Sequence, residues 1–465
     1  MKKFIFYPYL FALFPVLFLY THNIKETRLS QAFPALAISL VFFLLLWGIF
    51  LAVLKDSARA GIVTGVFILL FFSYGHLYEQ LNYLTSGFNL GVISHFVMIP
   101  VFLILWLMVF RFVLRSGKNF HAATGFLNIM ALCLVLINIF NIVVFEVNRS
   151  SATDSAGKPG LLSTRETAVL PDVYLIIMDE YAGLESIKKL YDYDNREFVH
   201  DLEKRGFYVA EKSKTGYASS EQCVASVLNM RFLERGEDPY RLIQNNQAAR
   251  LFKEQGYTIF IFPINSRAVF KNSDRVFEYT DPWFNDFNLT LLETSMLRFL
   301  AEAVMENKDY GQRYRDKILY IFETLGRLPG EKGAKFVYCH ILCPHVPFVF
   351  DAGGGAVQPG NFFNLKDKKY YLDQYIYMNK KLLETVDKLL KLSGVPPVIV
   401  IQSDHGQRGT TGSSRMPVGT SWQDIFSAYY LPGADTKGLS PSISPVNTFR
   451  LIFNAYFHCS FPILK

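Results

Sequence analysis

This 465-residue chain is too apolar for a wholly soluble protein, because 51% of its residues are hydrophobic and 43 residues are phenylalanine. Its length also exceeds that of one ordinary domain. The formal net charge of +7 does not indicate a nucleic-acid surface, since residues 1–150 hold ten basic and four acidic residues, whereas residues 151–465 hold 37 and 36. The excess positive charge therefore belongs to the first third of the chain.

Five apolar segments in that first third are each long enough to span a hydrocarbon core about 30 Å thick. They lie near residues 4–21, 33–54, 60–77, 90–113 and 124–145. Basic residues gather before the first segment and in alternate loops, at Lys2, Lys3, Lys55, Arg59, Arg111, Arg115 and Lys118. Because such loops stay on the cytoplasmic side, the pattern predicts a transmembrane domain over 1–146 with a cytoplasmic N-terminus. A cleavable signal peptide over 7–21 fits less well, because four more apolar segments follow.

A linker is predicted over 147–171, where small, polar and turn-forming residues follow one another. Beyond it, residues 172–465 alternate between strand-like and helix-like segments. Strands are predicted at 173–178, 257–262, 335–342, 397–402 and 426–431, and helices near 195–206, 221–232, 244–255, 290–325 and 370–393. This alternation predicts an extracytoplasmic α/β domain with a mostly parallel central sheet and helices on both faces.

Two of the predicted strands end in groups that bind metal ions. The first strand of the outer domain leads into Asp179 and Glu180, and the fourth leads into Asp404 and His405. Ligands in open α/β sheets bind outside the carboxyl ends of the strands, so we expect these side chains at one sheet edge. Two carboxylates and one imidazole suit a hard or borderline divalent cation. The alternative is that the Asp404-His405 pair only begins a loop.

A candidate nucleophile lies at the start of the helix predicted near 221–232. A turn-forming segment precedes Ser219 and Ser220, so Ser220 falls at or near the helix N-terminus, where backbone N–H groups favour an anion. A serine oxygen that touches a divalent cation also becomes more acidic and hence a better nucleophile. The simpler interpretation is that Ser219 or Ser220 only caps the helix.

The order of these groups resembles the alkaline phosphatase and sulfatase superfamily. The pattern is an acidic residue after a first strand (Asp179), a serine at a helix start about forty residues later (Ser220), and a late Asp404-His405-Gly406 segment. With five spans before it, the chain is most similar to the lipoteichoic acid synthases and the lipid A phosphoethanolamine transferases. The resemblance covers residues 171–457 and the topology before them. It implies a periplasmic catalytic domain anchored in a bacterial inner membrane.

Metal-binding roles follow from this resemblance. The ligands match Asp179, Asp404, His405 and Ser220, with Glu180 as an alternative to Asp179, and Ser220 also matches the nucleophile. No Asp-x-x-x-His pair is available for a second zinc site, so one divalent ion is expected. Zinc or manganese is favoured, with calcium as a third choice.

Substrate contacts are implied in the same way. The segment 340–348 resembles a His-x-Pro segment whose imidazole contacts the substrate phosphate or sulfate. That role falls first to His345 and second to His340, which could instead be a structural histidine of an apolar strand. Arg408 is a further candidate for a phosphate contact.

The function that the resemblance implies is transfer of a phospho-head group, of phosphoethanolamine or phosphoglycerol type, from a membrane lipid to an envelope glycan or lipid. The transfer would pass through a phospho-Ser220 intermediate. A hydrolase of phosphate or sulfate esters remains an alternative, although no Cys/Ser-x-Pro-x-Arg sequence follows Ser220 as in ordinary sulfatases. A non-catalytic envelope protein with the same fold is a second alternative. No nucleic-acid or protein partner is indicated, and one disulfide among Cys223, Cys339 and Cys343 is compatible with the sequence.

Overall fold

The computed structural model describes residues 5–24, 27, 29–87, 94–117, 120–151, 170–279, 286–305, 308–407, 422–434 and 438–465. The chain forms two compact units. One contains Met1–Asp154 and Thr280–Met305, and the other contains Ser155–Tyr279 and Glu306–Lys465. Each unit has its own buried apolar clusters.

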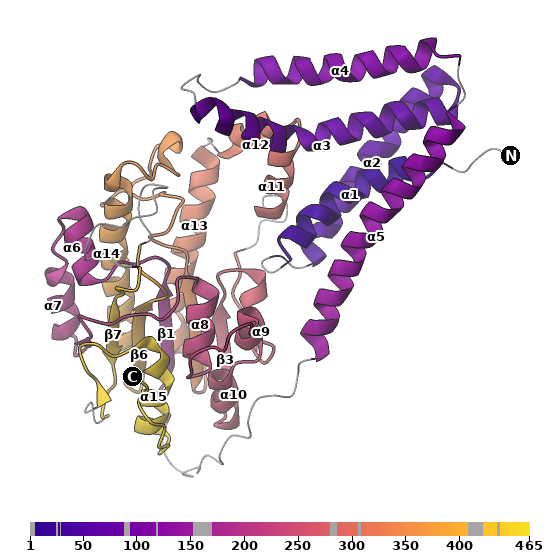
Figure 1. The fold of residues 1–465 in the computed structure, drawn as a ribbon. Helices are drawn as coiled ribbons and strands as arrows, with labels where there is room; N and C mark the ends of the chain where they lie inside the picture. The colour runs from indigo at the N-terminus through magenta and orange to yellow at the C-terminus, as the bar shows by residue number, and fades with distance from the viewer. Residues whose placement is uncertain are drawn as a thin grey trace. The chain divides into compact units, whose positions relative to one another are not determined.

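The first unit is a bundle of long apolar helices (Figure 1). They are α1 (Tyr7–His22), α2 (Leu29–Leu54), α3 (Ser57–Gly87), α4 (His95–Arg115) and α5 (His121–Ser151). Within the described ranges, the four helices from α2 to α5 are long and apolar enough to cross a membrane. Helix α1 has 16 residues, fewer than the roughly 20 that a span usually needs. Of the five predicted spans, four are therefore supported by the structure.

Two short helices of this unit come from a distant part of the sequence, α11 (Asp286–Thr294) and α12 (Arg298–Met305). The sequence predicted a helical stretch near 290–325, and the structure divides it into α11, α12 and α13 (Lys308–Leu325). The physical reason is the apolar surface of the segment. Phe287, Leu291 and Met296 pack into clusters formed with the membrane helices, and the Met296 N–H donates to the carbonyl oxygen of Phe71, 2.8 Å away.

Polar contacts also hold α12 against α3 and α4. The Arg298 guanidinium lies 2.9 Å from a carboxylate oxygen of Glu79 and 2.8 Å from one of Glu302. His95, which the sequence places inside an apolar segment, has its Nε2 2.8 Å from Glu302 and its Nδ1 2.6 Å from the Tyr74 hydroxyl. Together these contacts hold α12 within the first unit.

Substituting Gly75 by Ala should disrupt the packing of α3 against α11, because a Cβ atom at Gly75 would lie 2.0 Å from the carbonyl oxygen of Glu293. Overpacking of this kind typically costs about 1–3 kcal/mol. We expect a lower apparent Tm for the Gly75→Ala variant of the full chain in detergent. Gly48→Ala is the matched control, since Gly48 also lies in an apolar helix and a Cβ there would have no atom within 4 Å. Equal Tm values for the two variants would contradict the close packing of Gly75 against Glu293.

The second unit is built on a seven-stranded sheet with the order β2-β7-β6-β1-β5-β3-β4. The strands are β1 (Val173–Met178), β2 (Tyr208–Val209), β3 (Thr258–Phe262), β4 (Arg275–Val276), β5 (Lys335–Ile341), β6 (Val398–Ser403) and β7 (Ser427–Tyr430). Strands β6, β1, β5, β3 and β4 run parallel, and β7 is antiparallel to both β6 and β2. The mostly parallel sheet is thus confirmed, whereas β2 and β4 were missed because two residues carry no periodic pattern.

Helices cover both faces of this sheet (Figure 1), which explains why its central strands are buried at every position and mostly apolar. One face packs against α6 (Leu184–Tyr191), α7 (Arg196–Lys204), α13 and α14 (Lys368–Leu392), and the other against α8 (Ser220–Leu228), α9 (Pro239–Gln244), α10 (Gln247–Glu254) and α15 (Thr448–Tyr456). In β1, alternate residues enter the two clusters, such as Ile176 in the first and Leu175 in the second. The strand ends are therefore rigidly placed.

Candidate metal centre

The carboxyl ends of β1 and β6 bring the predicted ligands together. The two strands are parallel neighbours, and Met178 at the end of β1 pairs with Ser403 at the end of β6. The next residues, Asp179 and Asp404, therefore leave the sheet at the same level. Together with His405 they form a group whose ligand atoms all lie within 4.8 Å of one another.

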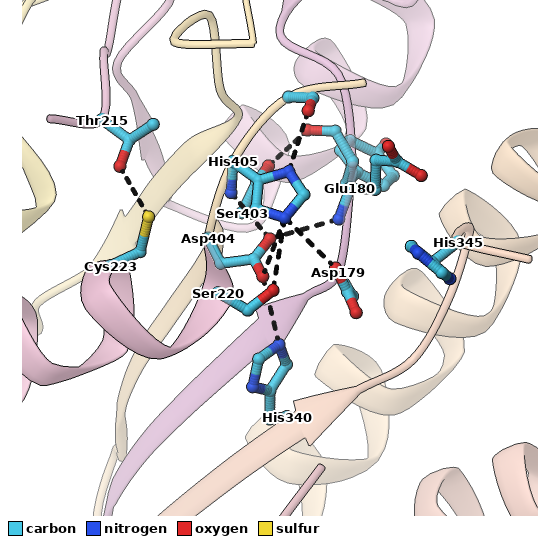
Figure 2. Close-up of polar contacts among 12 residues, drawn as sticks. Asp179, Glu180, Thr215, Ser220, Cys223, His340, His345, Ser403, Asp404 and His405 are labelled. Atoms are coloured by element: carbon cyan, nitrogen blue, oxygen red, sulfur yellow. Dashed lines mark hydrogen bonds and ion pairs between the residues drawn. The ribbon is translucent and has the colours of Figure 1, made fainter. Parts of the chain in front are cut away.

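The centre of this group is the Nε2 atom of His405 (Figure 2). It lies 3.2 Å from Ser220 Oγ, 3.7 Å from Asp179 Oδ1 and 3.7 Å from Asp404 Oδ2. Asp179, Asp404 and His405 are only 3%, 2% and 0% exposed. Two carboxylates and one imidazole thus form a buried cluster, and the half-buried Ser220 hydroxyl reaches it.

The orientation of His405 is set by its other ring nitrogen. Nδ1 lies 2.9 Å from the carbonyl oxygen of Gly406. Because a carbonyl oxygen can only accept, Nδ1 carries the proton and Nε2 presents its lone pair to the carboxylates and to Ser220. A histidine that donates one N–H to a backbone carbonyl and turns the other nitrogen inward is typical of a metal ligand.

Asp404 is held as a carboxylate by its surroundings. Its Oδ1 accepts from the backbone N–H of Glu180 at 3.2 Å and of His405 at 2.7 Å. Burial alone would raise the pKa of Asp404, but the neighbouring His405, His340 and Ser220 outweigh it and hold that pKa well below its usual range. Asp404 therefore remains an anion near neutral pH.

These groups fit a divalent cation. Zinc lies about 2.0–2.2 Å from carboxylate oxygen and imidazole nitrogen, so donors within a few ångströms of one another can share one ion. Within the described part of the chain, neither Asp404 Oδ2 nor His340 Nε2 has a hydrogen-bond partner of normal geometry. Buried anionic oxygens are costly unless they are paired or coordinate a metal. One divalent cation bound by Asp179, Asp404 and His405 would satisfy this requirement.

Ser220 reaches the group from the start of α8. Ser219 is the residue before the helix, and its hydroxyl donates to Gln222 Oε1 at 3.0 Å. Ser220 is the first helical residue, and its hydroxyl oxygen faces His405. The positive end of the helix dipole therefore lies at the Ser220 oxygen, where it would favour negative charge.

Of the two adjacent carboxylates after β1, Asp179 lies in the ligand group. Glu180 has a left-handed backbone with φ of 60°, which turns its amide towards Asp404. Figure 2 shows the Glu180 carboxylate pointing away from the cluster. Of the two, the structure therefore places the first choice, Asp179, in the ligand group and the alternative, Glu180, outside it.

The two candidate substrate histidines differ in position. His340 Nε2, at the end of β5, lies 3.5 Å from Asp404 Oδ2. His345 lies in the loop that follows β5, and its side chain stands apart from the cluster in Figure 2, with Nδ1 2.7 Å from the carbonyl oxygen of Val346. The structure thus brings His340, the second choice, closer to the ligand group than His345. Arg408 lies outside the described residues.

The three cysteines considered for a disulfide are free thiols. Cys223 Sγ lies 3.1 Å from Thr215 Oγ1. Cys339 and Cys343 are buried, and burial raises the pKa of both thiols. Neutral, buried thiols are poor nucleophiles.

Sequence reasoning missed the polar side chains of α14 that hold the loops around the site. Tyr371, Gln374 and Tyr375 lie on one buried face of the helix predicted near 370–393. The available signal was the spacing of these residues, because Gln374 and Tyr375 follow Tyr371 by three and four positions and so share one face of the helix. Their partners could not be inferred, because they are backbone groups far away in the sequence.

No protein-family model matches the chain, and neither does any curated protein. Solved structures do resemble it. The periplasmic domain of the phosphoethanolamine transferase EptC from Campylobacter jejuni is 12% identical, with a TM-score of 0.41 over 64% of this chain and 92% of that one. The lipoteichoic acid synthase LtaP from Listeria monocytogenes is 13% identical, with a TM-score of 0.41 over 61% and 71%. A phosphonate monoester hydrolase of Agrobacterium radiobacter is 12% identical, with a TM-score of 0.40 over 61% and 73%.

Proposed function

We propose that the chain is a membrane-anchored, metal-dependent phosphotransferase that uses Ser220 as its nucleophile. The observation that carries the proposal is the position of Ser220 Oγ, 3.2 Å from His405 Nε2 and next to two buried carboxylates at the ends of parallel strands. A serine needs an activating group to act as a nucleophile, and this constellation supplies one.

The proposed ligands of one zinc or manganese ion are Asp179, Asp404, His405 and Ser220 Oγ. When bound, such an ion makes the serine hydroxyl more acidic and neutralises charge on phosphoryl oxygens. His340 is the nearer of two histidines that could meet those oxygens, and His345 is the second. The start of α8 adds its partial positive charge at the same place.

Two displacements complete the proposed reaction. In the first, Ser220 Oγ forms a bond to phosphorus as the bond from phosphorus to the glycerol oxygen of the lipid breaks. The serine loses its proton, and the departing alcohol takes one up. In the second, the hydroxyl oxygen of an envelope glycan or lipid bonds to phosphorus and loses its proton, while Ser220 leaves and is reprotonated.

A lipid donor is consistent with the apolar helices of the first unit. Four helices fit a membrane, and the basic loops support a position of the α/β domain on the periplasmic side of a bacterial inner membrane. A catalytic domain tethered to a membrane meets lipid head groups at high local concentration. Phosphoethanolamine and phosphoglycerol head groups are therefore the proposed cargo.

The experiment that tests this proposal is mass spectrometry of the peptide that contains Ser220. Full-length protein in bilayers of phosphatidylethanolamine and phosphatidylglycerol would be quenched in acid and digested. We expect a Ser220 ester with the mass of phosphoethanolamine or phosphoglycerol, retained in Ser219→Ala and lost in Ser220→Ala. A bare phosphate ester would instead indicate a hydrolase. An unmodified Ser220 with either lipid would contradict the transferase.

A further inference from the structure

Three side chains on one face of α14 lie between the two loops that flank the candidate metal centre. Tyr371, Gln374 and Tyr375 are 1%, 0% and 0% exposed. Their spacing of three and four residues places them on the same side of the helix. Because buried polar atoms need partners, the hydroxyls and the amide bond to nearby backbone groups.

The first loop follows Asp179. The Tyr371 hydroxyl donates to the carbonyl oxygen of Glu180 at 2.7 Å and accepts from the N–H of Ala182 at 3.1 Å. Glu180 has a positive φ, a conformation that is unfavourable for a residue with a Cβ atom and that needs support from its surroundings. On its other side, the Glu180 N–H donates to Asp404 Oδ1. Tyr371 therefore holds Glu180, the residue that follows Asp179 and whose N–H donates to Asp404.

Tyr375 supports the same loop. Its hydroxyl donates to the carbonyl oxygen of Ala182 at 3.1 Å and accepts from Asn195 Nδ2 at 3.0 Å. Its ring stacks on Tyr181 with a centroid distance of 4.0 Å. The loop after Asp179 is thus held at both Glu180 and Ala182.

The second loop carries His345 and is held by Gln374. The amide oxygen accepts from the N–H groups of Val349 at 2.8 Å and Phe350 at 3.2 Å. The amide nitrogen donates to the carbonyl oxygens of Pro344 at 3.2 Å, His345 at 3.1 Å and Pro347 at 3.4 Å. Because two prolines leave this loop with fewer N–H donors, a side chain has to satisfy its carbonyls.

We propose that this face of α14, the α14 brace (Tyr371, Gln374 and Tyr375), positions the two halves of the site separately. Tyr371 positions the metal ligands through Glu180, and Gln374 positions the loop of His345 against the phosphoryl group. The second half rests on the proposed function, whereas the first needs only a metal. None of these side chains reaches the reacting atoms, so they are positioning residues.

Two dissociation constants separate these roles in the full-length protein, that of Zn²⁺ and that of inorganic phosphate at saturating Zn²⁺. In Tyr371→Phe we expect Zn²⁺ binding to weaken about 10–100-fold, the usual effect of losing a group that orients a ligand. Phosphate binding should then change less than about twofold. In Gln374→Met we expect the reverse, with phosphate binding about tenfold weaker and Zn²⁺ binding nearly unchanged.

Tyr370→Phe is the matched control, because it removes a hydroxyl from the neighbouring position of the same helix and should alter neither constant. Gln374→Glu, which retains an oxygen for Val349 and Phe350, is the second variant if Gln374→Met does not fold. Equal effects of the Tyr371 and Gln374 changes on both constants, or no effect on either, would overturn the proposal. Failure of the wild-type protein to bind phosphate would remove the proposed function and the role of Gln374, while the Zn²⁺ measurement would still decide that of Tyr371.

Discussion

Replacing Ser220 by Ala should lower turnover by about 10³-fold or more and leave the metal content unchanged. The change removes the only protein atom that bonds to phosphorus in the proposed reaction. Asp179, Asp404 and His405 should keep their positions, because the strand ends and backbone hydrogen bonds that hold them do not depend on the serine. Turnover would be measured as diacylglycerol release from labelled lipid, and metal content by elemental analysis of the same sample.

Ser219→Ala is the control for that experiment. Ser219 is adjacent in the sequence, yet its hydroxyl bonds to Gln222 rather than to the metal centre. It should therefore keep nearly full activity. Wild-type turnover in Ser220→Ala would exclude a covalent Ser220 intermediate, and loss of metal in that variant would make Ser220 an essential ligand.

Replacing Asp404 by Ala should weaken metal binding by more than about 100-fold and abolish activity with it. Asp404 supplies one of two carboxylates, and its low pKa keeps it charged for a cation. Its Oδ1 also accepts two backbone N–H groups, which lose their partner in the variant. Titration with Zn²⁺ against a chromophoric chelator would measure the change.

Glu180→Gln provides the comparison for Asp404→Ala. The change neutralises the Glu180 carboxylate, which points away from the ligand group although Glu180 is adjacent to Asp179. We therefore expect the Zn²⁺ affinity to stay within about twofold of wild type. If Glu180→Gln lost the metal and Asp404→Ala kept it, the assignment of the ligands would be wrong.

The strands that carry the site could be predicted because they are buried on both faces. Each strand has six consecutive buried residues, and its apolar run, 173–178 in β1 and 398–401 in β6, ends shortly before the polar ligands. The parallel arrangement then places Asp179 beside Asp404 without further information. The position of Ser220 was also predictable, because a turn-forming segment before a helical pattern marks a helix start.

Features that depend on distant partners could not be predicted. The break between α11 and α12 follows from apolar contacts of Met296 and Phe287 with membrane helices, which no local pattern shows. The choice between His340 and His345 depends on the loop geometry after β5. In the same way, a glutamine such as Gln374 is common in helices, and only its five hydrogen bonds to backbone groups indicate a positioning role.

The return of residues 286–305 to the membrane unit affects how the catalytic part can be produced for study. A truncated protein that begins after the linker would still contain α11 and α12, without the helices that cover Phe287, Leu291 and Met296. Uncovered apolar surfaces of this kind promote aggregation. Replacing the segment that contains α11 and α12 by a short polar connection between Tyr279 and α13 would remove the exposed apolar surface and leave every strand of the sheet in place.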